Sequence, residues 1–480
     1  MKTVAHVASS VRDLVERARF RPALGAVVRT LLGGIVASGS VVLSVVLRPQ
    51  VDKEDLHAAE QRVSQALKND TELDRLPDTY LAIAAPEARS LRFRSVDGSD
   101  VSKPAGRKFE YLDVVRDGSS KPRDRVVVGP DGVQTSAPPP AQASSPSQER
   151  NTRKRGRKRD ATSKAEPAGA PQPRRPRSVA RAEQMVNRVK VPSPPALKKL
   201  GYWMIQIDAG DGTGKHLPLF QDIFSTLDPT YRALGAHAWT ATFQHAIERV
   251  LVHVDTGGVW LFDRGFDDVA WMTWLHDKVQ QNVIRLKTNR LVHPGTEKEP
   301  VQGVGRLAET LAANHEVPVR YVNKSTHEVE HSTFRFAWAP IWVDGVNHAL
   351  YLVVAHTGRK RPLLLVTDRR PESSEEAGAL IQAYLERWGN EEVTRACKQL
   401  TGLERIRVRS LPAIRRLVWC AMIAIGIQAL SILTRPRLLR ATLDRAKEFI
   451  RTVRFVLYRV WRVVQQDLRA ALLARPHLFT

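Results

Sequence analysis

The sequence predicts an α/β fold in which helices flank a mixed sheet. Short apolar or alternating segments bounded by glycine- or aspartate-containing turns are typical of strands, and they recur through the middle of the chain. Helical spacing of apolar side chains dominates the two ends of the chain instead. With 480 residues, the chain is long enough for two or three domains with a sizeable core.

The composition indicates which class of binding partner and which cellular compartment to expect. The formal net charge of +24 favours a polyanionic partner, with nucleic acid ahead of an anionic membrane surface. The two cysteines, Cys397 and Cys420, are too few for a disulfide framework or a zinc cluster, which fits a reducing cytosol. Asp13, Glu16 and several arginines precede any apolar run, so we expect no signal peptide.

Residues 1–75 are predicted to form a helical domain. Further helices are expected at 23–37, 40–47 and 55–68, with basic residues near their ends. Such helices suit a small DNA-contacting bundle, and a purely structural bundle is the alternative. The first helix is indicated by four apolar residues that share one face: Val11, Leu14, Val15 and Ala18.

A strand is predicted at 91–96, where apolar and polar residues alternate, so that 76–120 supplies the first strand of the central sheet. Residues 121–195 follow as a low-complexity insertion rich in proline, serine and basic residues. Between 151 and 181 there are eleven Lys/Arg and two Asp/Glu residues. We expect this insertion to be disordered. It would grip DNA without sequence preference, or serve as a solvated insert without a fixed role.

The central sheet resumes in the segment 196–281. Two predicted strands, 201–208 and 216–224, are separated by a glycine- and aspartate-rich turn and therefore indicate a hairpin. A helix is expected at 242–253, and a buried strand at 259–262 follows it.

The segment 282–367 is predicted to be a β-rich insertion. Aromatic residues alternate there with polar ones, which is typical of half-buried strands; a DNA-stacking role for one of these aromatics is the alternative. The expected strands are 283–286, 317–322, 333–343, 349–355 and 363–367.

The C-terminal part is predicted to be helical, with core helices over 368–435 and a basic segment over 436–480 that forms one helix at about 437–470. The run 417–434 just reaches the length of a membrane span. It contains Gln428 and Ser431 and continues a mixed helix, so we interpret it as a buried core helix and expect no membrane association.

One stretch, 384–398, carries an unusual set of polar residues. It is predicted to be a single helix, with only Gly389 against that assignment. At 100° per residue, one face of this helix would collect a phenol, two cations and a carboxylate. An ordinary amphipathic surface helix is the alternative. The four residues of the face are Tyr384, Arg387, Glu391 and Lys398.

Three acidic residues are the candidate catalytic and metal-binding groups. Asp97 and Asp263 directly follow predicted strands and precede glycine-bearing turns, and Glu391 lies on the marked helix. Carboxylates that converge from strand ends and a helix are hard oxygen ligands that suit two Mg²⁺ ions. Two such ions can activate a water or a 3′-hydroxyl for phosphoryl transfer. The sequence has no P-loop or CxxC motif.

These motifs resemble those of a known family. Tyr384, Arg387, Glu391 and Lys398 fit the pattern Y-(2)-R-(3)-E-(6)-K without a gap. That pattern is the signature of cut-and-paste bacterial insertion-sequence transposases, which are DDE enzymes with an RNase H-like core. The run from Leu261 to Asp267, LFDRGFD, resembles their second-aspartate motif. The run VDGSD at 96–100, followed by Lys103, resembles their first.

The resemblance implies a function and roles for these residues. It implies a DNA transposase, an endonuclease and strand transferase, that uses two Mg²⁺ or Mn²⁺ ions held by Asp97, Asp263 and Glu391. It implies that the phenol and cations of 384–398 contact DNA phosphates near the transposon end. It also implies that 282–367 helps to hold cleaved ends, and that the enzyme acts as a homodimer on DNA. We then expect a cytoplasmic, nucleoid-associated protein. A transposon-derived DNA-binding protein without catalysis is the alternative.

The first aspartate has two rivals. Asp208 also follows an apolar strand, and Asp100 lies three residues after Asp97. The family's core begins with three antiparallel strands and carries its first aspartate on the first of them. If 201–208 and 216–224 are the second and third strands, the first is 91–96. This assignment favours Asp97 and makes 121–195 an insertion within the first hairpin.

Overall fold

The structure is a computed structural model of the 480-residue chain. The chain divides into two compact units, one formed by Met1–Val115 with Lys199–Thr480 and the other by Arg116–Lys198. In the second unit, β3 (Val127–Val128) and β4 (Gln134–Thr135) form an antiparallel pair. Apart from these strands, the insertion predicted at 121–195 lies outside the described residues. The structure describes all residues except 1, 104–107, 117–126, 129–133, 136–197, 213–214, 323–328, 359–360, 450–455, 477 and 480.

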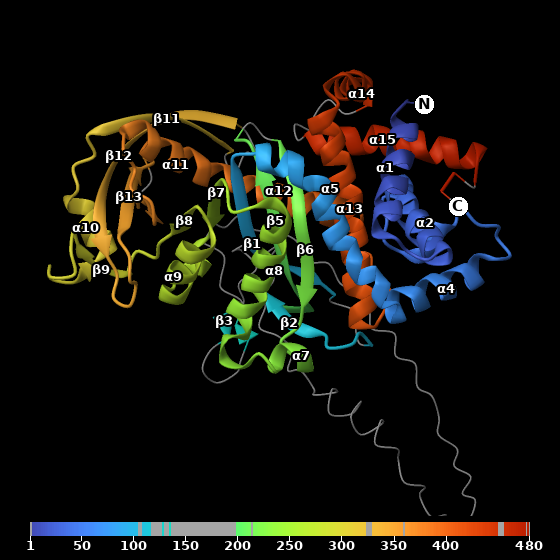
Figure 1. The fold of residues 1–480 in the computed structure, drawn as a ribbon, viewed down its shortest axis with the longest axis horizontal. Coiled ribbons are helices and arrows are strands. Elements are labelled where there is room, and N and C mark those ends of the chain that lie inside the picture. Colours follow the sequence, from blue (N-terminus) through green and yellow to red (C-terminus); the bar gives the residue numbers. More distant parts are fainter. Residues whose placement is uncertain are drawn as a thin grey trace, which may run out of the picture. The chain divides into compact units, whose positions relative to one another are not determined.

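A mixed sheet lies at the centre of the first unit (Figure 1). β1 (Phe93–Ser102) is antiparallel to β5 (Lys198–Gly210) on one side and parallel to β7 (Val259–Phe262) on the other. β6 (His216–Phe224) pairs antiparallel with β5, and β8 (Gln281–Arg285) pairs parallel with β7. The order of these strands is therefore β6-β5-β1-β7-β8, and the predicted mixed sheet is confirmed.

The strands of the 282–367 segment extend this same sheet. β14 pairs antiparallel with β8, and the other strands continue outward from β14 to give a 12-stranded sheet. β8, at the start of the segment, is thus the direct neighbour of β7. The remaining strands are β2 (Asp113–Arg116), β9 (Leu291–Pro294), β10 (Gln302–Gly303), β11 (His315–Val322), β12 (Val329–Trp342), β13 (Leu350–His356) and β14 (Leu363–Thr367).

The first strand of the core is longer than predicted. The sequence predicts that it ends before a turn at Asp97-Gly98, but β1 continues to Ser102. The reason is that β5 offers partners along the whole length of β1, from Gly210 opposite Phe93 to Gly201 opposite Ser102. Asp97 therefore lies within a strand rather than in a turn.

Helices pack against the sheet and against one another. α13 contacts β6, α12 contacts β1, and α11 contacts β11. The helices are α1 (Lys2–Ala18), α2 (Pro22–Ser38), α3 (Leu43–Leu47), α4 (Leu56–Asn69), α5 (Leu76–Ser90), α7 (Pro229–Arg232), α8 (Ala238–Val254), α9 (Val269–Lys278), α10 (Val304–Thr310), α11 (Ser374–Glu386), α12 (Trp388–Leu400), α13 (Leu411–Thr434), α14 (Pro436–Phe449) and α15 (Val456–Ala474). Short 3₁₀ turns are η1 (Thr71–Arg75), η3 (Gly235–His237), η4 (Arg264–Phe266) and η5 (Leu403–Arg405).

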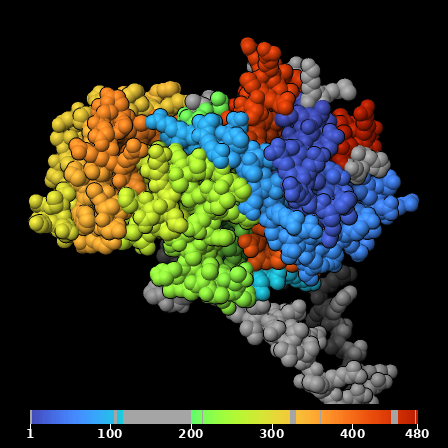
Figure 2. All heavy atoms as spheres, in the orientation of Figure 1, coloured from blue at the N-terminus to red at the C-terminus, as the bar shows by residue number. Residues whose placement is uncertain are grey.

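The N-terminal helices share their core with the C-terminal ones. α1 and α2 pack on α13 and α15, and α4 packs on α13. Figure 2 shows the N-terminal segment, in blue, lying against C-terminal segments in red. Their buried side chains belong to the same hydrophobic cluster as those of the sheet, so residues 1–75 are not separated from the core by a linker.

The apolar helix α13 lies in this core. Within the described residues it is the one helix long and apolar enough to cross a membrane, but 78% of its most apolar window is buried inside the protein. It packs against β6, α2, α4 and α5. Because neighbouring elements already cover it, the helix does not indicate a membrane protein.

The C-terminal basic segment differs from the prediction. The single helix expected over 437–470 is wrong, because α14 and α15 are separate helices that pack against each other. Residues 450–455 between them lie outside the described residues. Arg445 of α14 pairs with Asp467 of α15, with a closest N–O distance of 2.6 Å. The apolar side of α15 is buried against α2 and α13, which one continuous helix could not combine with this pairing.

Candidate functional site

Two of the predicted carboxylates come from neighbouring parallel strands. β1 and β7 pair from Phe93 opposite Val259 to Val96 opposite Phe262. Asp97 and Asp263 are the residues that directly follow this last pair. The two strands therefore bring both carboxylates to the same end of their pairing. The Asp263 side chain also accepts a hydrogen bond from the Arg264 amide at 2.6 Å, which caps η4.

The stretch that carries the other predicted residues is not one helix. The single helix expected over 384–398 is wrong, because α11 and α12 meet at a turn at Arg387. Tyr384 lies in the last turn of α11, whereas Glu391 and Lys398 lie on α12. The two helices pack on different parts of the sheet, α11 on β11 and α12 on β1. Angular positions on one ideal helix therefore do not describe how these side chains are arranged.

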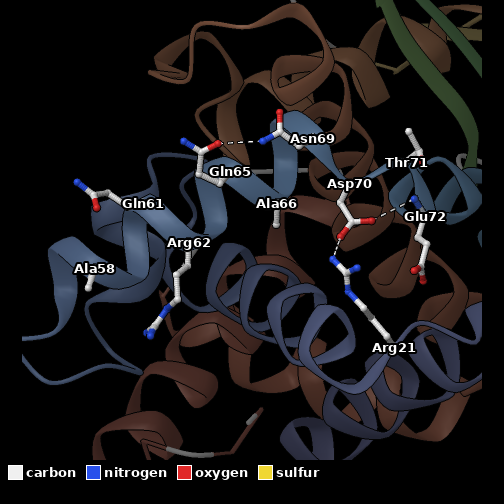
Figure 3. A pocket seen from close by; sticks show the side chains of 10 residues that line it. All are labelled: Arg21, Ala58, Gln61, Arg62, Gln65, Ala66, Asn69, Asp70, Thr71 and Glu72. Atoms are coloured by element: carbon white, nitrogen blue, oxygen red, sulfur yellow. Dashed lines mark hydrogen bonds and ion pairs between the residues drawn. The ribbon is translucent and has the colours of Figure 1, made fainter.

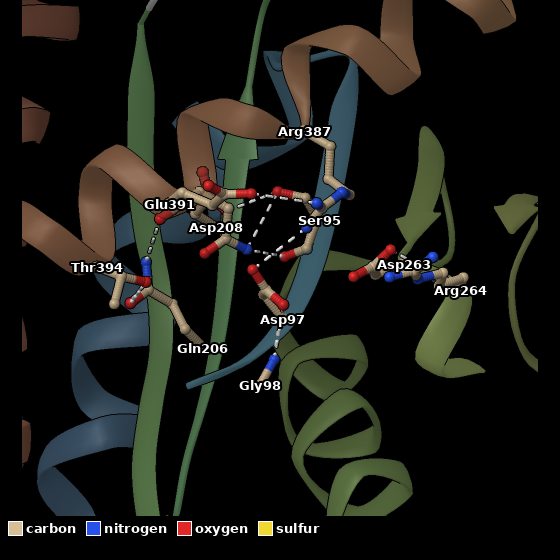
Figure 4. A network of polar contacts seen from close by, with 11 residues as sticks. Ser95, Asp97, Gly98, Gln206, Asp208, Asp263, Arg264, Arg387, Glu391 and Thr394 are labelled. Atoms are coloured by element: carbon tan, nitrogen blue, oxygen red, sulfur yellow. Dashed lines mark hydrogen bonds and ion pairs between the residues drawn. The ribbon is translucent and has the colours of Figure 1, made fainter. Parts of the chain in front are cut away.

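The turn directs Arg387 between two of the carboxylates. One guanidinium nitrogen lies 3.2 Å from an Asp97 oxygen, and the other lies 3.4 Å from an oxygen of Glu391. The Arg387 side chain is only 8% exposed. Burial disfavours its charge, but Asp97 and then Tyr384, Asp263 and Glu391 favour it and raise the pKa of Arg387 overall. Figure 4 shows Arg387 beside Asp97 and Glu391.

The electrostatics of Asp97 reflect this crowding. Burial raises the pKa of the Asp97 carboxyl to about 6. The Arg387 cation lowers this pKa, whereas the negative charges of Asp263 and Glu391 raise it further. Asp97 thus interacts electrostatically with both other predicted acids, and its charge is poorly stabilised despite the arginine. Perturbed carboxyl groups of this kind are enriched at functional sites.

Tyr384 and Lys398 lie at the borders of this arrangement. Tyr384 is buried, its ring centre lies 5.7 Å from the Arg387 guanidinium carbon, and burial raises the pKa of its hydroxyl. Lys398 lies 3.8 Å from an Asp100 oxygen and 3.7 Å from a Glu404 oxygen.

A cavity of about 160 Å³ opens beside Arg387. Its polar lining is basic and aromatic, with Arg285, Arg361, Tyr384, Arg387 and Trp388 among the residues that form it. Arginine forks and aromatic faces are groups that bind phosphates and bases. The cavity therefore places anion-binding side chains next to the carboxylates.

A larger open hollow of about 850 Å³ lies on α4, away from the carboxylates (Figure 3). Its wall includes three exposed polar side chains of α4: Gln61, Arg62 and Gln65. Arg21 forms an ion pair with Asp70 at its edge. The lining mixes charges of both signs and lacks a cluster of titratable groups, so it does not suggest a catalytic centre.

Residues 236–427 match a family model described as Transposase DDE domain. The match supports a DDE transposase family and suggests a transposase. It runs from η3 into α13 and so includes Asp263, Arg387 and Glu391, whereas Asp97 lies before it. No curated protein matches the chain.

The two rivals for the first predicted acid have other partners. Asp208 lies opposite Ser95 on β5 and is 1% exposed. It accepts a hydrogen bond from the Ser95 hydroxyl at 2.7 Å and lies 3.0 Å from His216 Nδ1. Asp100 faces Lys398. Of the three aspartates, Asp97 is the one that contacts Arg387.

Asp267, which sequence reasoning left without a role, holds the loop after Asp263. Its buried carboxylate accepts hydrogen bonds from the Lys287 amide at 2.7 Å and from Arg290 Nε at 2.6 Å. Arg290 also donates to the Asp267 carbonyl oxygen. The signal in the sequence is the second acid of LFDRGFD, but its basic partner is more than 20 residues away and no local pattern identifies it.

The donor chemistry of the three predicted acids fits a hard cation, although the side chains are not gathered around one point. Carboxylate oxygens are the ligands that Mg²⁺ prefers. Within the described residues, no group of three or more His, Cys, Asp or Glu side chains is close enough together to hold a metal ion. Arg387 lies between Asp97 and Glu391 and provides positive charge there.

Proposed function

We propose that this protein is a DNA transposase of the insertion-sequence type, with an RNase H-like core that carries Asp97, Asp263 and Glu391 as its catalytic acids. It would cleave transposon ends and join them to target DNA in a cut-and-paste reaction. The observation that carries the proposal is that Asp97 and Asp263 end the same parallel strand pair while Arg387 links Asp97 to Glu391. The strand order β6-β5-β1-β7-β8 and the matched DDE domain support it.

The three carboxylates would hold two Mg²⁺ or Mn²⁺ ions. Such ions supply Lewis-acid stabilisation of the attacking and leaving oxygens in phosphoryl transfer. Burial is the main cause of the raised pKa of Asp97, and the negative charges of Asp263 and Glu391 add to it. This added contribution supports the role, because a bound cation would relieve the repulsion among the carboxylates. The chain's own contribution is to keep the strand-borne acids and the helix-borne acid at one end of the sheet.

Tyr384, Arg387 and Lys398 would contact DNA phosphates near the transposon end. The basic and aromatic lining of the cavity beside Arg387 supports this, since phosphate recognition relies on such groups. Arg387 would exchange part of its pairing with Asp97 and Glu391 for a phosphate as DNA enters. We further propose a homodimer that bridges two transposon ends in the cytoplasm, associated with the nucleoid.

Other segments would serve DNA binding. The helices of 1–75 would read transposon ends, and the exposed amide and arginine side chains on α4 support this, because such groups suit base-edge contacts. The segment 282–367 would help to hold cleaved ends, and the basic 121–195 insertion would bind DNA without sequence preference.

The deciding experiment replaces the helix-borne acid. Glu391→Gln keeps the size of the side chain but removes its charge, so we expect cleavage of donor DNA to fall at least about a thousandfold. Binding of the flanking inverted repeats should persist. Glu386→Gln, in the same segment but outside the acidic set, is the matched control and should cleave normally. The assignment is wrong if Glu391→Gln cuts donor DNA at the wild-type rate.

A second candidate is a transposon-derived DNA-binding protein without catalysis. The ion pairs of Arg387 with Asp97 and Glu391 favour it, because they satisfy both carboxylates within the protein. The two candidates differ in a nicking assay on the inverted repeats with and without Mn²⁺. Metal-dependent nicking by the wild-type protein supports the transposase, and binding without nicking supports the second candidate.

A further inference from the structure

A chain of buried polar groups joins the helix that carries Glu391 to the strand that carries Asp97. Asn390 Nδ2, on α12, donates to the Ser95 carbonyl oxygen at 3.0 Å and lies 3.2 Å from the Ser95 hydroxyl. The Ser95 hydroxyl in turn donates to Asp208 on β5 at 2.7 Å. These three residues are at most 5% exposed. Figure 4 shows Ser95 and Asp208 beside the carboxylates.

Two of these hydrogen-bonded residues are close in sequence to the proposed catalytic acids. Asn390 directly precedes Glu391 in sequence, and Ser95 is two residues before Asp97, on the same face of β1. We propose that Asn390, Ser95 and Asp208 are positioning residues, which fix the first turn of α12 on β1 and thereby set where Glu391 stands relative to Asp97. The catalytic meaning of this positioning rests on the function proposed above.

His216 adds a second constraint on the same turn. Its Nδ1 lies 3.0 Å from the other Asp208 oxygen, and its side chain is 7% exposed. A Cβ atom at Gly389 would lie 1.9 and 2.0 Å from two atoms of the His216 ring. The ring therefore packs directly against the α12 backbone, which only glycine allows here. This explains the one residue in 384–398 that disfavours a helix.

Buried hydrogen bonds favour one specific position of α12 on β1. A buried carboxylate and a buried amide are costly unless hydrogen-bonded, so sliding α12 along β1 would leave Asp208 and Asn390 partly unsatisfied. An apolar contact of the same size would tolerate such sliding, because apolar packing is not directional. These hydrogen bonds thus restrain the register of α12 on β1, next to Glu391 and Asp97.

A second buried bond of α12 provides the control. Thr394 Oγ1 donates to Gln206 Oε1 at 2.8 Å, and this bond joins α12 to β5 without passing through Ser95. Gln206 Nε2 also donates to the Asn390 carbonyl oxygen at 3.5 Å, a contact that a change of Thr394 leaves in place. Ser95→Ala and Thr394→Val each remove one buried hydroxyl, so similar losses of stability are expected. Only the first substitution interrupts the connection between Asp208 and Asn390. Ser95→Thr keeps the hydroxyl and should restore wild-type behaviour.

The experiment has two readouts on the full-length protein. Hydrogen exchange measures the protection of the 388–392 amides without any reaction, and Ser95→Ala should raise their exchange about five- to tenfold. The Mn²⁺ concentration that gives half-maximal cleavage should rise about tenfold or more in Ser95→Ala. In Thr394→Val, both values should stay close to wild type.

Each result has a distinct meaning. The inference is overturned if Ser95→Ala leaves exchange over 388–392 unchanged, or if Thr394→Val shifts the Mn²⁺ dependence as much as Ser95→Ala does. If the wild-type protein shows no metal-dependent cleavage, the proposed function fails. Exchange over 388–392 still decides whether Ser95 fixes the first turn of α12.

Discussion

Replacing Asp97 by Asn should stabilise the protein relative to wild type increasingly as the pH rises, even though it removes a proposed catalytic acid. Burial, with the negative charges of Asp263 and Glu391, raises the pKa of Asp97 to about 6 from an ordinary value of 3.8. Between pH 3.8 and about 6, the folded protein therefore binds more protons at Asp97 than the unfolded chain does. Stability from this group is greatest below pH 3.8, falls as the pH rises, and levels off above about 6.

The magnitude follows from the shift. A rise of about two pKa units, at roughly 1.4 kcal/mol per unit, corresponds to about 3 kcal/mol. The Asp97 side chain is 21% exposed, so solvent screening does not remove most of this cost. Asparagine resembles the protonated acid in shape and charge. The advantage of Asp97→Asn over wild type should therefore grow by about 2.5 kcal/mol between pH 4 and pH 8, since the unfolded carboxyl is already partly ionised at pH 4.

Urea unfolding without divalent cations, at several pH values, measures this difference directly. Ser99→Ala, an uncharged change two residues further along β1, is the control and should alter stability by an amount independent of pH. A flat difference between Asp97→Asn and wild type from pH 4 to 8 would refute the reasoning. So would a growing penalty with pH, because it would mean that Arg387 stabilises the Asp97 anion more than burial destabilises it.

Two further substitutions test contacts around the site. Gly389→Ala should destabilise the protein by about 1–3 kcal/mol, because its Cβ would overlap the His216 ring. In the His216→Ala background, Gly389→Ala should instead be stabilising, since alanine is otherwise the better helix former by about 1 kcal/mol. Thermal melting checks both, and a stabilising single substitution would contradict the packing. Asp267→Asn should cost about 3 kcal/mol in urea unfolding, because it leaves the Arg290 charge without its buried partner. Asp268→Asn, at an exposed N-cap where asparagine is equally suitable, should cost little, and equal losses for the two would contradict the assignment.

Much of the fold could be predicted from local patterns. The strand predicted at 216–224 coincides with β6, and the one at 363–367 coincides with β14, because both are apolar runs bounded by clear turns. The mixed sheet was likewise predictable. The end of β1 was not, because the length of β5 opposite it decides where pairing stops, and that information lies about a hundred residues away. Helix ends inside 384–398 and 437–470 depend in the same way on what each helix packs against.

The candidate site, like the fold, could be predicted only in part from local sequence patterns. The types and order of the acidic residues gave Asp97, Asp263 and Glu391 as candidates, and their roles stay a prediction. The sequence did not reveal that Arg387 pairs with Asp97 across 290 residues, since no local spacing relates them. Asp208 was weighed only as a rival acid. Its buried bonds to Ser95 and His216 became visible only when β1, β5 and β6 were placed side by side.

The turn at Arg387 has a physical cause that links the fold to the site. A continuous helix from Ser374 to Leu400 would be about 40 Å long, and a straight rod of that length cannot follow a twisted sheet. The break lets α11 pack on β11 while α12 packs on β1. It also leaves Arg387 at the corner, where its two terminal nitrogens reach Asp97 and Glu391. A planar guanidinium can bond two separate carboxylates at once, whereas an ammonium is a single point charge. Arg387 therefore holds Asp97 and Glu391 near each other, and it does so at the same bend that fits α11 and α12 to the sheet.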